Sequence, residues 1–187
     1  YREGQWIEIE AMAKAGQKLP FSEKLKYEAH LMVQEPVRIG ELLARANCTR
    51  IIAHIEVFED AQAVRNAFSK WKDAGAMEFG MALLIDTPLT SLDSCISDCD
   101  VVQLMSIATL GKQGAPYDPR VIGRIAELHE RNPELTISID GGISEKNIAD
   151  LARAGARRFG VGSALSKSKN PAESYARLKA LAESAIV

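Results

Sequence analysis

Short apolar runs alternate with helix-like segments along nearly the whole chain, and this alternation restricts the fold more than any other feature. The runs are nearly continuously apolar, and the segments between them have the spacing of amphipathic helices. Such alternation is typical of a parallel sheet whose strands are buried by helices. We therefore predict an α/β fold with seven strands and a final helix. The expected strands are residues 6–12, 27–33, 50–56, 79–84, 101–107, 135–140 and 158–162.

The last two runs end in glycines, and the first of these brings a carboxylate, Asp140, to the end of its strand. Backbone without Cβ atoms lets N–H groups approach an anion, and a helix expected to begin near Ser144 would point its positive end the same way. At the C-terminal face of a barrel, the loops after strands 7 and 8 commonly form such a phosphate site. The predicted phosphate-binding residues here are Gly141, Gly142, Gly162 and Ser163.

A closed (β/α)8 TIM barrel has eight strands and is usually longer than this chain. We therefore predict a TIM barrel, as a single domain over residues 1–187, that lacks its first βα unit in this chain. An open doubly wound sheet is the alternative. It is less favoured, because no glycine-rich dinucleotide turn follows the first strand.

Composition excludes several classes of protein. The chain has 187 residues, of which 47% are hydrophobic and 26% charged, with a formal net charge of −2. These values are ordinary for a globular protein, and the lack of a basic excess argues against nucleic acid as a partner. The apolar runs are too short to span a membrane, and the start has no signal-peptide pattern. Three cysteines without zinc-ribbon spacing predict reduced thiols and a cytoplasmic location.

Several motifs, taken in order, resemble the ribulose-phosphate 3-epimerase family over nearly the whole chain. The most specific is His-Leu-Met-Val at residues 30–33, with Pro36 three residues on. The others are Gly80-Met81-Ala82-Leu83 followed by Thr87-Pro88, Leu104-Met105-Ser106-Ile107, Ile139-Asp140-Gly141-Gly142-Ile143 and Gly162-Ser163-Ala164. The resemblance implies a (β/α)8 barrel, a divalent metal and interconversion of ribulose 5-phosphate and xylulose 5-phosphate.

The chain departs from the family pattern at its start. The strand matched by residues 6–12 carries His-x-Asp-x-Met-Asp-Gly in the family, so Glu8 replaces a metal-binding His and Glu10 an acid/base Asp. The stretch from Met12 to His30 is shorter than in the family, and the first family strand, with its substrate-binding Ser, has no counterpart. The family's Gly-Phe-Gly-Gly-Gln loop becomes Leu-Gly-Lys-Gln-Gly at residues 110–114.

The resemblance implies a full site for epimerisation at C3. Asp140 and Glu10 would move the proton on opposite faces of the carbon, and His30, Asp140, Glu8 and Glu10 would hold Zn²⁺, Fe²⁺ or Mn²⁺. The metal would neutralise the enediolate as a Lewis acid. The residues expected to line the enediolate are Met12, Met32 and Met105. Gly111 and Gly114 would close over the phosphate.

Simpler interpretations stand beside these. Asp140 also fits a helix-capping turn residue, His30 a core histidine, and Glu8 and Glu10 the exposed face of an edge strand. The methionines also fit an ordinary core. His54 and Glu56 end another strand, and we interpret them as polar rim residues without a role.

The leading function is a metal-dependent pentulose-phosphate 3-epimerase acting on a small phosphosugar, and a homo-oligomer is compatible with it. Two alternatives remain. A phosphosugar lyase would use the same phosphate site with an Asp/Lys pair, but no strand ends in a clear catalytic lysine. A catalytically altered paralogue would keep the barrel and bind a phosphorylated ligand without turning it over.

Overall fold

The computed structural model describes residues 10–108 and 115–186. The chain divides into two compact units. The N-terminal unit comprises Tyr1–Ala82 and Ser91–Asp100, and the C-terminal unit comprises Leu83–Thr90 and Val101–Val187.

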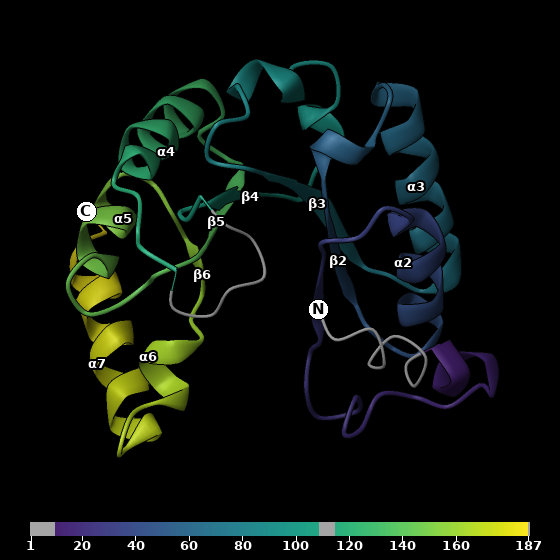
Figure 1. Cartoon of the computed structure of the whole chain (residues 1–187), viewed down its shortest axis with the longest axis horizontal. Coiled ribbons are helices and arrows are strands. Elements are labelled where there is room, and N and C mark those ends of the chain that lie inside the picture. Colours follow the sequence, from purple (N-terminus) through teal and green to yellow (C-terminus); the bar gives the residue numbers. More distant parts are fainter. Residues whose placement is uncertain (1–9, 109–114, 187) are drawn as a thin grey trace. The chain divides into compact units, whose positions relative to one another are not determined.

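The N-terminal unit contains strands β1 (Glu28–Leu31), β2 (Arg50–His54) and β3 (Glu78–Leu83), whose last residue already belongs to the C-terminal unit. The three strands pair in parallel and in sequence order. Helices α2 (Pro36–Arg45) and α3 (Ala61–Ala74) make the crossovers and lie together against one face of these strands (Figure 1). Parallel neighbours need such long crossovers, so β1, β2 and β3 are each separated by a helix.

The core of this unit forms between the strands and the two helices. Trp71 of α3 is fully buried there, and Ile51 and Ile52, which point to opposite faces of β2, are fully buried as well. The indole N–H of Trp71 donates to the carbonyl oxygen of Val37 at 3.1 Å, which links α3 to the first turn of α2. Gly40 lies under this ring, and a Cβ atom at that position would overlap the indole. The close approach of α2 and α3 therefore depends on a glycine.

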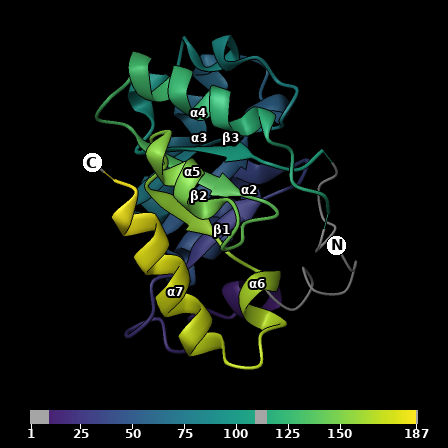
Figure 2. The ribbon, with the colours of Figure 1, turned by 90° about the vertical axis from the view of Figure 1, so that its left-hand side faces the viewer.

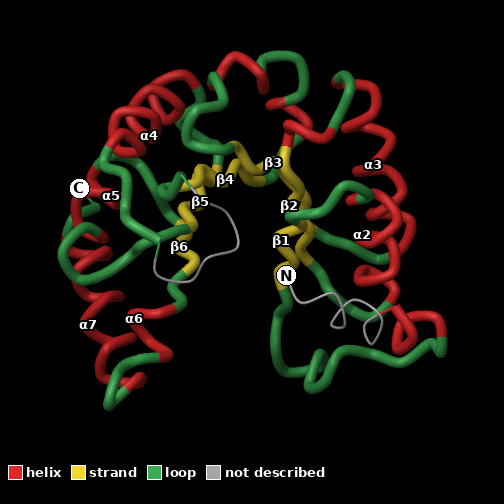
Figure 3. The backbone as a smooth tube through the Cα atoms, in the orientation of Figure 1, coloured by secondary structure: helices red, strands yellow, loops and turns green. Residues whose placement is uncertain are grey.

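The C-terminal unit repeats the pattern with β4 (Val101–Met105), β5 (Thr136–Asp140) and β6 (Arg158–Gly160), again parallel and in order. Its helices lie on one side of these strands and face the viewer in Figure 2. They are α4 (Arg120–Arg131), α5 (Ile148–Arg153), α6 (Ser163–Ser166) and α7 (Pro171–Ser184). The separation of strands from helices is visible within each unit in Figure 3.

Short 3-10 helices occupy several connections in the described residues. They are Ile55–Val57, Leu89–Leu92 and Ile96–Asp98. None of the helices in the described part of the chain has the length and apolar character needed to cross a bilayer.

The predicted parallel α/β class is confirmed, and six of the predicted strands are present. The strand expected over residues 6–12 is wrong in its described part, because residues 10–13 are helical. Alanines favour that turn, and Glu10 and Lys14 form an (i, i+4) ion pair along it. The helix expected near Ser144 begins only at Ile148. Closure into an eight-stranded barrel, the missing first unit and the single domain stay predictions.

We expect Gly40→Ala to lower the free energy of unfolding by about 1–3 kcal/mol, as overpacking of a well-filled core does. Trp71 is buried and hydrogen-bonded, so the ring cannot simply move aside. Gly123→Ala is the matched control in the first turn of α4, where a Cβ meets nothing within 4 Å. That variant should gain about 0.5–1 kcal/mol from helix propensity. Urea unfolding of both variants measures the difference, and equal stabilities would contradict the close approach of α2 to Trp71.

Candidate functional site

Two histidines meet at the C-terminal ends of β1 and β2. The register places His30 opposite Ile52, so His54 lies two residues further along the neighbouring strand on the same face. The Nε2 atoms of the two rings are 2.9 Å apart, and the rings stack with centroids 5.0 Å apart. His54 is almost fully buried, with 4% of its surface exposed. On its other side, Nδ1 of His54 lies 3.1 Å from Oε2 of Glu56.

Glu10 is held by two cations. Its Oε1 lies 2.8 Å from Nζ of Lys14 and 2.8 Å from Nη1 of Arg38. Arg38 also reaches Oε2 of Glu35 at 3.4 Å. The hydrogen bond from Lys14, assisted by Arg38, lowers the pKa of the Glu10 carboxyl. Glu10 is thus on a helical turn and ionised, and a carboxylate with a lowered pKa is a weaker base.

Asp140 ends β5, where Met105 of β4 and Gly160 of β6 are its direct neighbours in the ladder. Its backbone carbonyl accepts hydrogen bonds from Ser106, from N–H at 2.9 Å and from Oγ at 3.1 Å. The buried Ser106 hydroxyl also donates to the carbonyl of Gly141. Gly160 leaves room for the carboxyl group, because a Cβ there would lie 3.3 Å from Oδ1 of Asp140. The backbone at Asp140 is therefore held by the residue that follows β4, and Gly160 of β6 leaves space for its side chain.

The two glycines after Asp140 are required by backbone conformation as well as by space. Gly141 and Gly142 have φ values of +119° and +62°, in the region that L-residues with side chains disfavour. A Cβ on Gly141 would meet Ile107 at 2.8 Å, and one on Gly142 would meet Tyr117 at 2.9 Å. The double glycine is thus explained by the turn alone. Its role in binding phosphate stays a prediction.

Asn147 ties this turn together. Its Oδ1 accepts from the backbone N–H of Ser144 at 2.8 Å, and its Nδ2 donates to the carbonyl of Gly142 at 3.0 Å. Helix α5 starts immediately after it. One side chain therefore spans the loop between Asp140 and the helix.

The other predicted phosphate residues fall in two places. Gly162 and Ser163 begin the single turn α6 in the same unit as the glycine pair. Gly111 and Gly114 lie outside the described residues.

The methionines expected to line the site have different surroundings. Met105 is buried at the end of β4, opposite Asp140. Met32 directly follows β1 and is half-buried, and Met12 is half-buried on the helical turn that carries Glu10. Met105 therefore lies beside Asp140, and Met12 shares a helical turn with Glu10.

The described residues do not test the predicted metal-ligand set as a whole. Glu8 lies outside them, Glu10 is occupied by its ion pairs, and His30 and Asp140 belong to different units. Within the described ranges, no group of three His, Cys, Asp or Glu side chains is arranged to hold an ion. The donor set that the structure describes therefore does not fit a complete metal centre, and the ligand set stays a prediction.

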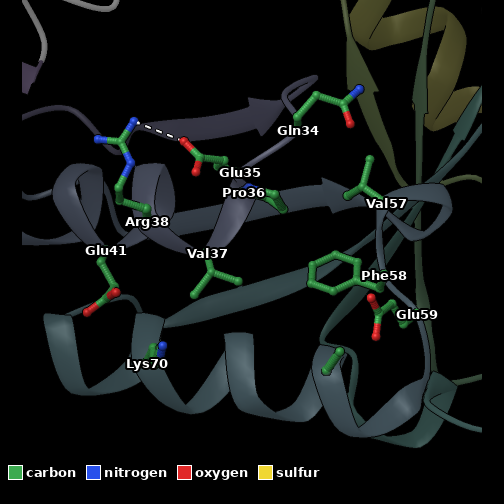
Figure 4. Close-up of a pocket in the computed structure, with 11 residues that line it drawn as sticks. Gln34, Glu35, Pro36, Val37, Arg38, Glu41, Val57, Phe58, Glu59 and Lys70 are labelled. Carbon is green, nitrogen blue, oxygen red and sulfur yellow. Dashed lines mark hydrogen bonds and ion pairs between the residues drawn. The ribbon is translucent and has the colours of Figure 1, made fainter.

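A cavity of about 420 Å³ opens between α2, α3 and the loops that follow β1 and β2 (Figure 4). Its charged lining is mixed, with Arg38 and Lys70 among several glutamates. Arg38 already pairs with Glu35 and Glu10. Neither His30 nor His54 lines it. None of the predicted site residues lines this cavity, so it gives no support to the predicted phosphosugar site.

The positioning contacts were not found by sequence reasoning. Ser106 and Asn147 had no predicted role, and His54 and Glu56 were interpreted as polar rim residues. A buried histidine between a second imidazole and a carboxylate becomes recognisable only when neighbouring strands are in register. The His-x-Glu spacing at a strand end was the only signal in the sequence.

We expect Asn147→Ala to lower the free energy of unfolding by about 1–2 kcal/mol, because two loop hydrogen bonds are lost. Asn66→Ala makes the same chemical change on the exposed face of α3, where Oδ1 of Asn66 accepts a hydrogen bond from Nε2 of Gln62 at the surface, and it should cost little. Urea unfolding followed by circular dichroism compares the two. Equal effects would show that Asn147 does not brace the turn.

Comparison with known proteins gives a consistent result. The sequence model of the ribulose-phosphate 3 epimerase family matches residues 7–166. A ribulose-phosphate 3-epimerase of Aquifex aeolicus is 32% identical over 166 residues, covering 87% of this chain and 72% of that protein. One from Schizosaccharomyces pombe is 29% identical over 157 residues, covering 84% and 67%.

Among solved structures, one titled "Native KDPGal structure" is similar in fold. Its TM-score is 0.57 at 18% identity, over 97% of this chain and 78% of that one. This likeness concerns the fold alone, whereas the family match covers most of the sequence. The chain belongs to the ribulose-phosphate 3-epimerase family.

Proposed function

We propose that this protein epimerises a ketopentose phosphate at C3, converting D-ribulose 5-phosphate to D-xylulose 5-phosphate. The observation that carries the proposal is Asp140, a carboxylate on a strand end that leads into a braced glycine turn, in a chain of this family. The relatives' names point to the same reaction class. A small phosphosugar is accordingly the proposed ligand and the cytoplasm the proposed location.

The reaction requires a base that removes the proton on C3, next to the C2 carbonyl, and an acid that returns a proton to the opposite face. In this proposal Asp140 carries one of these transfers. Its electron pair takes the proton, and the C3–H electrons move into the enediolate. The backbone N–H groups around Gly142, Gly162 and Ser163 are the proposed anchor for the phosphate, which holds C3 in place while the proton moves.

Glu10 is the predicted acid or base on the second face of C3, and its ion pairs affect how well it could transfer a proton there. Lys14 and Arg38 keep it ionised and lower its pKa, so it would donate a proton poorly in this arrangement. A divalent Zn²⁺, Fe²⁺ or Mn²⁺ ion stays the predicted cofactor, and elemental analysis of the purified protein tests it. No step above depends on that ion.

The ion pairs of Glu10 favour a second candidate function. A paralogue that binds a phosphorylated ligand without turnover would retain the glycine turn and lose the second acid. The ion-paired Glu10, in place of the family's aspartate, is the feature expected of such a protein.

The proposal predicts that wild-type protein in D₂O incorporates deuterium at C3 of ribulose 5-phosphate as xylulose 5-phosphate appears. Asp140→Asn should lower turnover at least about 10³-fold, because the amide cannot act as a base, while phosphate still protects the protein from heat. Asp150→Asn on α5 is the control and should retain turnover. ¹H-NMR follows both signals. A wild-type protein without exchange but with phosphate protection would instead identify the non-catalytic paralogue.

Gly160→Ala tests the placement of the Asp140 carboxyl without removing it. The new Cβ would press on Oδ1 and displace it by a few tenths of an ångström. Since a misplacement of about 1 Å costs roughly 10²-fold in rate, we expect turnover to fall up to about tenfold. Gly160 is exposed, so the melting temperature should hardly change. Unchanged turnover, with Gly123→Ala as reference, would mean that this carboxyl position does not matter.

A further inference from the structure

Two cysteines flank a short 3-10 turn in the N-terminal unit. Cys95 directly precedes the turn Ile96–Asp98, and Cys99 directly follows it. The backbone N–H of Asp98 donates to the carbonyl of Cys95 at 3.0 Å, and the backbone N–H of Cys99 donates to the carbonyl of Ile96 at 3.1 Å. The turn is therefore closed by hydrogen bonds that involve both cysteines, which brings the two residues back toward one another.

The thiols of this pair lie together. Sγ of Cys99 points back at Cys95 and lies 3.5 Å from its carbonyl oxygen. The two side chains also hydrogen-bond to each other, and this contact lowers the pKa of the Cys95 thiol and raises that of the Cys99 thiol. When the pair loses one proton, the other therefore stays between the two sulfur atoms, which share one negative charge.

The surroundings of the pair combine access with stabilisation of that charge. Cys95 is buried, whereas Cys99 is partly exposed. The guanidinium of Arg65 favours a negative charge on Cys95, and the backbone of Met81 hydrogen-bonds to the Cys99 thiol and favours a charge there. The carboxyl group of Asp98 opposes both, but its Oδ2 lies 3.4 Å from Nη1 of Arg65, which offsets part of its charge. Thiolates are the form of cysteine that oxidants attack, and one of these sulfurs is within reach of solvent.

Cys48, the third cysteine of the chain, is held differently. Its thiol is buried and donates to backbone carbonyls, with Sγ at 3.4 Å from the oxygen of Tyr27 and 3.3 Å from that of Arg50. Burial raises the pKa of this thiol to about 11. A buried and protonated thiol is inert toward oxidants, so Cys48 serves as a reference within the same molecule.

We propose that Cys95 and Cys99 form a reversible oxidation site, at which a hydroperoxide converts their two thiols to a disulfide. The accessible sulfur of Cys99 attacks the hydroperoxide, the O–O bond breaks, and Cys99 becomes a sulfenic acid. The sulfur of Cys95 then attacks Sγ of Cys99, and the S–O bond breaks as hydroxide leaves and takes up a proton. With hydrogen peroxide, two thiols and one peroxide give one disulfide and two water molecules.

The test treats the reduced full-length protein with hydrogen peroxide. After alkylation in denaturant, trypsin releases both cysteines of the pair in one peptide, residues 73–112, and Cys48 in another, residues 46–50. Mass spectrometry should show that the first peptide loses two hydrogen atoms and escapes alkylation, and that dithiothreitol restores both thiols, while Cys48 stays alkylated. Two alkylated thiols in the first peptide, sulfinic acid without a disulfide, or disulfide-linked dimers would overturn the proposal.

Matched variants and unfolding test the role of the turn. Cys48→Ser should form the disulfide at the wild-type rate, and Cys99→Ser should form none while circular dichroism shows it folded. The disulfide should also form at least about tenfold faster in the folded protein than in urea that unfolds it, because the fold holds the two sulfur atoms together. Equal rates in the folded and unfolded chains would overturn the role of the turn.

The oxidation site is independent of the proposed function. Neither cysteine belongs to the predicted epimerase site, and the reaction with peroxide needs no phosphosugar. A protein without deuterium exchange would overturn the epimerase and leave the disulfide result standing. An active epimerase whose two thiols stay alkylated after peroxide treatment would overturn the oxidation site alone.

Discussion

The parallel register of neighbouring strands is the constraint on which the candidate site depends. Parallel strands end at a common edge, so residues far apart in sequence become neighbours there. In the N-terminal unit this brings together His30 and His54, and in the C-terminal unit it aligns Met105, Asp140 and Gly160. A slip by one residue would turn each of these side chains to the opposite face. The buried apolar strands that prevent the slip thus also maintain the chemistry at their ends.

Hydrogen bonds at these strand ends hold in place the groups that the strand register brings together. Ser106 holds the backbone at Asp140, Asn147 braces the glycine turn, and Glu56 orients His54. Each is a short contact from the strand end or its following loop, and none belongs to the regular ladder. Glu10 is different, because its partners are Lys14 and Arg38 on helical segments. These two cations lower the pKa of the Glu10 carboxyl, which opposes a role as a proton donor.

The sequence predicted the secondary structure correctly where the local hydrophobic pattern determines it. The apolar runs around Ile51, Val102 and Ile137 are strands because both faces are buried. It failed at residues 10–13, where alternating apolar and acidic residues suggested a strand and the alanines formed a helical turn. The sequence also predicted the start of α5 too early. Residues around Ser144 form a loop, in which Oδ1 of Asn147 accepts a hydrogen bond from the backbone N–H of Ser144, and the helix begins after it.

The sequence by itself determined the family, the parallel α/β class and the candidate residues His30, Asp140 and the glycine pair. The hydrophobic periodicity of each segment and the order of the motifs are sufficient for these, because both are properties of the linear sequence. Only the tertiary structure decided that His54 lies between His30 and Glu56, and that Gly160 leaves space for the carboxyl of Asp140. These relations join different strands, and hydrogen-bond direction and steric room depend on distances that no linear pattern contains.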